Sequence, residues 1–165
     1  MTPRPMHRQD RQLPQEEAWA LLTQGTYGVL SVVGDEGWPY AVPMHYSVMD
    51  GQIYLHCAKT GYKLDAIARD DRVCFTVTLR EELVQDHATS LYESVVVLGR
   101  AALVTDQATH QAALAHLVDA LGRVSPDLRD QYIARRGQNT AVLVIRPIHL
   151  TGKAKRDFRP IQQRM

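Results

Sequence analysis

The sequence has few cysteines and no large excess of charge of either sign. Its 165 residues include 2 cysteines, Cys57 and Cys74, so neither a disulfide framework nor the ligand set of a structural zinc site is expected. Lysine and arginine total 19 against 18 for aspartate and glutamate, giving a formal net charge of +1. Nucleic-acid and membrane-surface partners normally require a strong basic field, so neither kind of partner is expected.

Long apolar runs are also absent. Runs such as Val95–Leu98 and Ala141–Ile145 are far shorter than the roughly 20 residues of a membrane-spanning helix. The segment Met1–Leu13 is polar and rich in arginine, unlike a secretory signal. Hydrophobic residues make up 45% and charged residues 22% of the chain, as in ordinary globular proteins. We therefore expect one cytoplasmic domain over residues 1–165, with loose tails at 1–8 and 154–165.

The order of apolar periodicities and turn signals predicts an antiparallel sheet with inserted helices. Helices are expected from Pro14 to about Thr23, around Leu64–Asp70, from Asp106 to Gly122 and over Asp127–Arg136. Strands are expected at Thr26–Val33, Trp38–Met49, Gln52–Cys57, Val73–Leu79, Leu91–Val104 and Ala141–Ile145. Arg80–Thr89 is expected to be a polar loop, Gly99 a bulge, and Pro147 the limit of pairing of the last strand. This order predicts an α+β protein built on a six-stranded antiparallel barrel, with long strand edges that dimerisation would cover.

The dipeptide Asp50-Gly51 predicts a two-residue hairpin turn and so fixes a register. In that register, directly opposed residues share one face of the hairpin. The core-like face is Met44, Tyr46, Val48, Ile53, Leu55 and Cys57. The other face is Pro43, His45, Ser47, Tyr54, His56 and Ala58. Because the second face is aromatic and polar, it suits a planar ligand or a partner subunit.

His45 and His56 are opposed on that second face, and three interpretations are open. They can be surface or interface residues that happen to face each other. They can contact a ligand. They can also share a zinc or copper ion, although no third ligand is adjacent.

The segment Ala58–Lys63 follows the third strand and leads into a helix. Backbone amides at a turn and at a helix start suit an anion, Gly61 permits close approach, and Lys59 and Lys63 add positive charge. The alternative is a helix start with two solvated lysines. Further along, Tyr92–Ser94 opens the long fifth strand either as a plain polar start or as a cofactor or interface contact.

Several stretches together resemble a known superfamily. They are Arg8–Arg11, Gly28–Ser31, Gly37–Tyr46, Gly51–Lys63, Tyr92–Val95 with Gly99, and Ile148–Lys153. In these stretches the sequence resembles the pyridoxamine 5′-phosphate oxidase-like, FMN-binding split-barrel superfamily, and within it the nitroimidazole-resistance (Nim-type) group. The resemblance covers nearly the whole chain, with the stretches in the same order.

The resemblance implies a homodimer with two FMN sites at the interface. The backbone of Pro43, Met44, His45 and Tyr46 would line the isoalloxazine ring, and the segment from His56 to Lys63 would hold the ribityl phosphate. Within that segment Lys59, Thr60 and Lys63 would lie nearest the phosphate, Ala58 and Gly61 would also contact the cofactor, and Tyr92 and Ser94 would supply further contacts. His56 matches the histidine that Nim-type proteins place beside the flavin, so it is the candidate for substrate chemistry.

The chain departs from the vitamin B6 oxidases in two places. Those enzymes have a more arginine-rich phosphate segment and a C-terminal substrate motif containing arginine, whereas this chain has Gly152–Arg156. Oxidation of pyridoxamine phosphate is therefore not expected. The first hypothesis is an FMN-dependent oxidoreductase of small molecules, with nitro-aromatic compounds as one substrate class. The alternatives are a non-enzymatic flavin-nucleotide binder and a haem-binding split-barrel protein with His45 or His56 as axial ligand.

Overall fold

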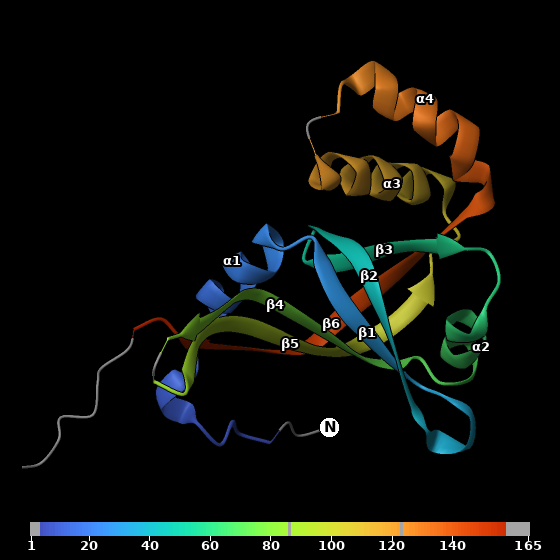
Figure 1. Cartoon of the computed structure of the whole chain (residues 1–165). Coiled ribbons are helices and arrows are strands. Elements are labelled where there is room, and N and C mark those ends of the chain that lie inside the picture. The colour runs from blue at the N-terminus through green and yellow to red at the C-terminus, as the bar shows by residue number, and fades with distance from the viewer. Residues whose placement is uncertain (1–3, 86, 123, 158–165) are drawn as a thin grey trace, which may run out of the picture.

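The computed structural model describes residues 4–85, 87–122 and 124–157. Its six strands form one antiparallel sheet that closes on itself in the order β1-β2-β3-β6-β5-β4 (Figure 1). The strands are β1 (Tyr27–Val33), β2 (Pro39–Met49), β3 (Gln52–Ala58), β4 (Arg72–Val84), β5 (Thr89–Leu103) and β6 (Thr140–Lys155). The expected α+β class and the six antiparallel strands are confirmed.

In the part of the chain that the structure describes, four α-helices lie outside the sheet: α1 (Gln15–Gln24), α2 (Tyr62–Arg69), α3 (Gln107–Leu121) and α4 (Pro126–Arg136). Short 3₁₀ turns are η1 (Gln9–Arg11), η2 (Asp35–Gly37) and η3 (Gly137–Asn139). Two α-helices have side-chain caps that explain where they begin. Asp106 accepts a hydrogen bond from the backbone N–H of Thr109, and Ser125 accepts one from that of Leu128. Within the described chain, no helix is long and apolar enough to cross a membrane.

The β2–β3 hairpin has the predicted turn and register. Asp50 and Gly51 have φ values of 52° and 70°, as a primed two-residue turn requires. The paired residues are Met49 with Gln52, Val48 with Ile53, Ser47 with Tyr54 and Tyr46 with Leu55. The hairpin prediction is therefore confirmed over these four pairs.

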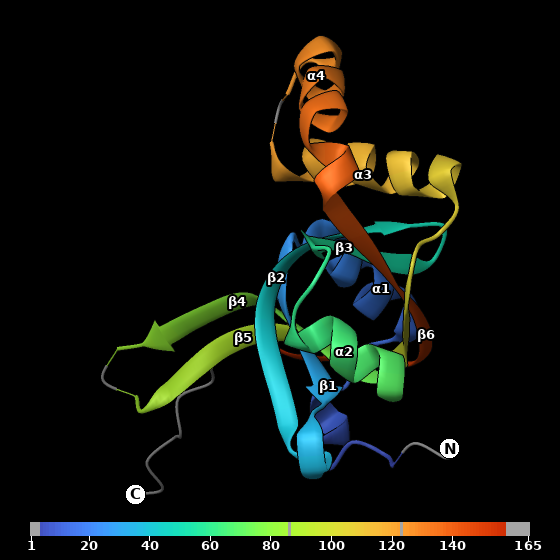
Figure 2. The ribbon, with the colours of Figure 1, turned by 90° about the vertical axis from the view of Figure 1, so that its right-hand side faces the viewer.

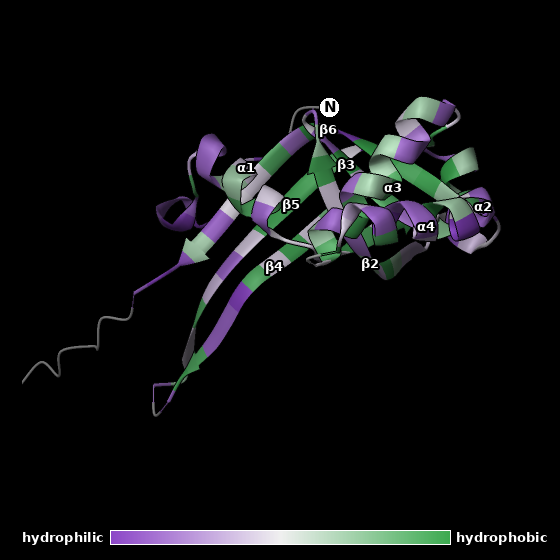
Figure 3. Cartoon of the chain, turned by 90° about the horizontal axis from the view of Figure 1, so that it is seen from above, coloured by the Kyte–Doolittle hydropathy of each residue, from purple (hydrophilic) through white to green (hydrophobic). Residues whose placement is uncertain are grey.

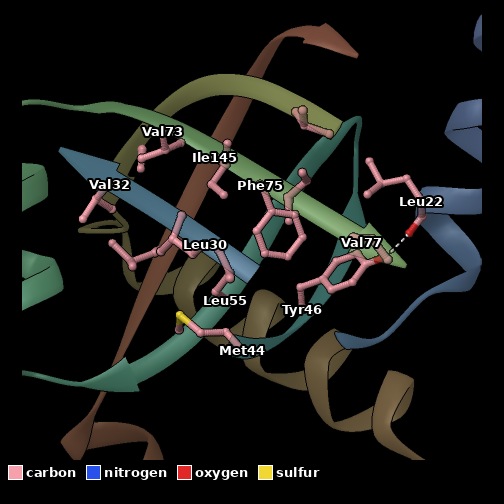
Figure 4. Packing of buried hydrophobic residues seen from close by; sticks show 14 of the residues in the cluster. Leu22, Leu30, Val32, Met44, Tyr46, Leu55, Val73, Phe75, Val77 and Ile145 are labelled. Carbon is pink, nitrogen blue, oxygen red and sulfur yellow. Dashed lines mark hydrogen bonds between the residues drawn. The ribbon is translucent and has the colours of Figure 1, made fainter. Parts of the chain in front are cut away.

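The main core fills the inside of the ring. Leu30, Tyr46, Leu55, Phe75 and Ile145 are fully buried there (Figure 4), and the predicted core face of the hairpin points into it. A buried Tyr needs a partner for its hydroxyl. The hydroxyl of Tyr46 donates to the carbonyl of Leu22 at 2.6 Å and so joins β2 to the end of α1 (Figure 4).

The prediction of a polar loop at Arg80–Thr89 is wrong. β4 continues to Val84 and pairs with β5 as far as Thr89, so the two strands form an arm that extends away from the ring (Figures 2 and 3). Much of the arm is exposed to solvent, with Leu83 69% exposed, although Leu91 on β5 is buried. A register shift between Thr78 and Arg80 marks where the arm leaves the ring.

The predicted end of the last strand at Ile145 is also wrong, because β6 continues past Pro147 to Lys155. Proline removes a backbone donor, and this strand accommodates it at an irregularity. Leu98 pairs with His149 and Gly99 with Pro147, so the register shifts beside the proline. The irregularity lies beside Gly99 as predicted, but the extra residue is Ile148 on β6 and not Gly99 itself. The described strand reaches Ala154 and Lys155, two residues of the expected tail.

A second, smaller core lies on the outside of β2, β3 and β6. There α3 packs over Tyr54, Val142 and Val144 through its own Ala113, Leu114 and Leu117. α4 turns back along α3, so the pair forms a separate layer beside the ring (Figure 1).

Candidate functional site

The hairpin strands β2 and β3 separate beyond their four paired positions. Before Tyr46, β2 pairs only with β1, from Val33–Pro39 to Tyr27–His45. β3 meanwhile pairs with β6 from Ile53 to Ala58. Within the described chain, the edge of β2 from Pro39 to His45 that faces away from β1 therefore carries no strand. Its backbone groups are available to a ligand.

The side chains of the predicted ring-binding segment point in two directions. Met44 and Tyr46 are buried in the main core, and Pro43 and His45 are exposed. A ligand at this edge would therefore meet the backbone of Met44 and Tyr46 but the side chain of His45. The Nδ1 atom of His45 lies 3.1 Å from the carbonyl oxygen of Thr26, so this nitrogen donates to it.

His45 and His56 are not paired in the sheet. His45 lies opposite Tyr27 on β1, and His56 lies opposite Val142 on β6. The predicted register also opposes Met44 to Cys57 and Pro43 to Ala58. None of these pairs, nor His45–His56, forms, because β2 pairs there with β1 and β3 with β6. Nor does any group of three or more potential metal-ligating side chains occur among the described residues.

His45 and His56 still interact electrostatically, although they are not paired in the sheet. His56 is half-buried, and burial lowers its pKa from the ordinary value of 6.5, with the nearby His45 lowering it further. The imidazole of His56 is therefore neutral at neutral pH. A neutral imidazole offers one donor and one acceptor to a bound molecule.

The centre of the predicted ligand face is occupied by protein. Ser47 and Tyr54 are 3% and 4% exposed, beneath α3. The interpretation of that face as a ligand or partner surface is wrong at these two positions, because α3 covers them. The Ser47 hydroxyl is the buried side-chain oxygen left without a partner in the described chain.

The turn between β3 and α2 has the exposure that an anion site needs. Ala58, Lys59, Thr60 and Gly61 are exposed and Lys63 is half-buried. Gly61 caps α2 with φ 138° and ψ 160°, and no side chain caps the helix. The first N–H groups of a helix have no partner within it. Lys63 also lowers the pKa of Cys57, against the larger effect of burial, which raises it.

Tyr92 and Ser94 lie on β5, away from the β2–β3 hairpin and the turn before α2. Ser94 pairs with Thr78 on one side and with Lys153 on the other, several strands from His45 around the ring. The Tyr92 hydroxyl accepts a hydrogen bond from Arg11 at 2.9 Å, and the Lys153 ammonium lies over its ring. One chain therefore does not bring Tyr92 and Ser94 to the Lys59–Lys63 turn.

Sequence reasoning missed several aromatic residues around the open edge of β2. The Tyr27 ring contacts His45 edge-on, with centroids 4.8 Å apart, and Tyr40 contacts Tyr62 on α2 in the same way. The hydroxyl of Tyr62 accepts a hydrogen bond from the N–H of Asp35 at 2.6 Å. The strand β1 was predicted, but no local signal indicated that Tyr27 on its exposed face would contact His45.

Comparisons with known proteins agree with this architecture. A family model described as pyridoxamine 5′-phosphate oxidase matches residues 14–154, whereas a comparison with curated proteins finds no match. Among solved structures, the chain is similar to a proposed 5-nitroimidazole antibiotic resistance protein from Bacteroides thetaiotaomicron, with a TM-score of 0.71 and 22% identity, over 87% of this chain and 86% of that one. It is also similar to an FAD-binding protein from Mesorhizobium loti, with a TM-score of 0.66 and 23% identity, over 88% of this chain and 97% of that one.

A third similar structure is the flavocytochrome Anf3 from Azotobacter vinelandii, with a TM-score of 0.76 and 22% identity, over 97% of this chain and 76% of that one. At these identities the likeness concerns the fold. The family match spans the chain from α1 to the last residues of β6. The chain belongs to the pyridoxamine 5′-phosphate oxidase family.

Proposed function

We propose that this protein binds a flavin nucleotide between the open edge of β2 and the turn that starts α2. The observation that carries the proposal is the absence of a strand beside residues 39–45 of β2, in the described chain, next to a turn with two lysines. A flavin ring has polar atoms along one edge, so it can replace a missing strand as the partner of backbone groups. The FAD-binding protein and the flavocytochrome with this fold support the proposal.

The residues of the turn fit a phosphate group. Lys59 and Lys63 supply charge, Thr60 supplies a hydroxyl, and the start of α2 supplies backbone N–H groups. A Cβ atom added at Gly61 would meet nothing within 4 Å, so space for an anion is open there. Because the turn offers one phosphate site, we propose FMN rather than FAD as the occupant.

We further propose that the protein is an oxidoreductase acting on small molecules, including nitro-aromatic compounds. When bound, the flavin supplies electron transfer. The chain's own residues hold and orient it, and the neutral imidazole of His56 can accept or donate a proton at a bound substrate. The fold likeness to a proposed nitroimidazole resistance protein supports this substrate class.

We also propose that two chains associate through the outer face of β2, β1, β4 and β5. One row across that face consists of Pro43, Val29, Thr76 and Val96, which are small or apolar. Val29 and Val96 are 36% and 37% exposed, and a face of this composition favours a partner protein over water. Association would bring Ser94 and Tyr92 of one chain towards the flavin site of the other.

The test of the cofactor is the absorbance spectrum of the purified protein, followed by chromatography of the released compound. FMN is the expected product, FAD would correct the choice of nucleotide, and a Soret band in place of a flavin spectrum would overturn the proposal. Replacement of Lys63 by Gln should weaken FMN binding by about 1–3 kcal/mol, as for a charge-assisted contact. The control with the same charge change is Arg146→Gln, at an exposed position of β6.

The reductase activity is tested separately on the flavin-loaded protein. The bound flavin is bleached anaerobically with NAD(P)H or dithionite, and a nitroimidazole is then added. We expect the flavin to reoxidise with the substrate present. If it stays reduced, the protein is a flavin-nucleotide binder and the reductase proposal is wrong.

The dimer is tested by light scattering. Val96→Arg places a charge on the outer face and should reduce the measured mass to that of one chain. Leu103→Arg, at the far end of the same strand and also exposed, is the control. A wild-type mass of one chain would refute the proposed association.

A further inference from the structure

A cavity of about 340 Å³ lies between α3 and α4 on the outside of the ring. Its walls are mostly aliphatic, with Leu117 and Val118 from α3 and Leu128 and Ile133 from α4. The side chain of His56, on β3, also lines it. This volume is at the lower end of the ~300–1,000 Å³ range of small-molecule sites, so the cavity suits a small ligand.

The two ends of this cavity differ in polarity. At the end where α3 passes into α4, the lining residues are Leu121, Val124 and Leu128. A salt bridge at 3.0 Å between Arg129 and Asp119 holds the helices together near this end. That end is therefore apolar, and its residues Leu121 and Leu128 are partly exposed to solvent.

The opposite end is polar and lies at the start of β6. Thr140 donates from its hydroxyl to the carbonyl of Arg136 at 2.9 Å, which places the end of α4 beside the sheet. Thr140 pairs with Ala58, two residues beyond His56 on β3. The lining residues Arg136, Thr140 and His56 therefore gather at this end.

The charge of the lining is of one sign. No aspartate or glutamate lines the cavity among the described residues, whereas Arg136 does. Arg136 has no recorded ion pair within the described chain, in contrast to Arg129 on the same helix. A ligand with a negative charge at this end would therefore be favoured over a cation.

We propose that the cavity binds a small amphiphile, with its apolar body between α3 and α4 and a carboxylate head near Arg136 and His56. This inference deepens the proposed function, on which it rests for any redox step, because it identifies a substrate class for the site that contains His56. The binding step itself needs no flavin. It can therefore be tested independently of the cofactor.

The experiment compares octanoate with octanol by isothermal titration calorimetry on the full-length protein, with and without FMN. Octanoate should bind with one site per chain, and octanol more weakly. Arg136→Gln should weaken octanoate by about 3- to 10-fold and leave octanol unchanged. Arg135→Gln is the matched control, since Arg135 is the neighbouring residue in α4 but does not line the cavity.

A second variant fills the space. Val118→Phe should abolish binding of both probes without lowering the melting temperature, because the added ring occupies an existing cavity. FMN affinity is measured in every variant. If FMN binds and octanoate does not, this inference is wrong and the proposed function stands. If octanoate binds and FMN does not, the proposed function fails instead.

Two further outcomes would overturn the inference. One is an equal loss of octanoate affinity in Arg135→Gln and Arg136→Gln. This result would show that positive charge on α4 attracts octanoate without a specific binding site. The other concerns Leu128→Asp, which places a charge at a wall residue that is 58% exposed. If this change alters the molecular mass measured by light scattering, the cavity between α3 and α4 is part of an interface between chains.

Discussion

Tyr27 and His45 lie directly opposite each other on β1 and β2, and their rings meet edge-on with centroids 4.8 Å apart. The pair stands at the end of the open edge of β2, on the exposed side of the sheet. The orientation of the His45 ring is therefore restrained by two contacts. They are the edge-on contact with the Tyr27 ring and the hydrogen bond from Nδ1 to the Thr26 carbonyl.

Replacing Tyr27 by Ala should lower flavin affinity. An aromatic contact contributes about 0.5–1.5 kcal/mol beyond burial, which corresponds to about 2- to 10-fold in the dissociation constant. Fluorescence titration of the flavin-free protein measures it. Tyr132→Ala, on α4 and 54% exposed, should leave flavin affinity unchanged; an equal loss there would contradict the role of Tyr27.

Replacing Gly61 by Ala should disturb the turn before α2. The φ of 138° and ψ of 160° belong to a region that only glycine occupies readily, and other residues cost about 1–3 kcal/mol there. We expect a lower melting temperature together with weaker FMN binding. The control is Gly122→Ala, since φ there is 165° and a Cβ atom would meet nothing within 4 Å. Identical melting temperatures for the two variants would argue against this account.

Replacing Tyr46 by Phe should destabilise the fold without touching the cavity between the helices. The change removes a buried hydrogen bond to Leu22 and leaves that carbonyl without its partner, at a cost of about 1–3 kcal/mol. Urea unfolding measures the loss. Tyr132→Phe, at an exposed position, should change the free energy of unfolding by less than about 0.5 kcal/mol.

The lowered pKa of His56 makes stability depend on pH. Below the ordinary pKa of 6.5 the unfolded chain binds a proton that the folded chain resists, so this contribution is fully present above pH 6.5 and is lost as pH falls through the folded pKa. Melting temperatures from pH 8 to 5 should therefore fall less steeply in His56→Gln than in the wild type. His116→Gln, at an exposed position of α3, should follow the wild-type curve; a wild-type slope in His56→Gln would count against the effect.

The parts of the fold that sequence predicted well depend on short-range signals. The Asp50-Gly51 turn determined four cross-strand pairs correctly, and Asp106 correctly marked the start of α3. Beyond Tyr46 the same register failed, because β1 and β6 compete for the two strands. Pairing between distant strands leaves no local signal, so the separation of His45 from His56 could not be predicted.

Longer-range structure caused the other errors as well. The arm of β4 and β5 was expected to be a loop because its residues are polar, which is equally typical of a solvated two-stranded ribbon. Ser47 and Tyr54 were assigned to a face suited to a ligand or a partner subunit, because no sequence signal showed that α3 would cover them. The Ala58–Lys63 turn was placed correctly between β3 and α2. Its role in flavin binding stays a prediction.

The position of β6 also has a consequence for how the chain folds during synthesis. β6 is the last strand of the described chain but pairs with both β3 and β5 in the ring. Until Thr140–Lys155 has left the ribosome, β3 and β5 each present an unpaired edge to the cell. These edges can pair with other chains in the interval before β6 emerges, so the nascent protein is exposed to aggregation then.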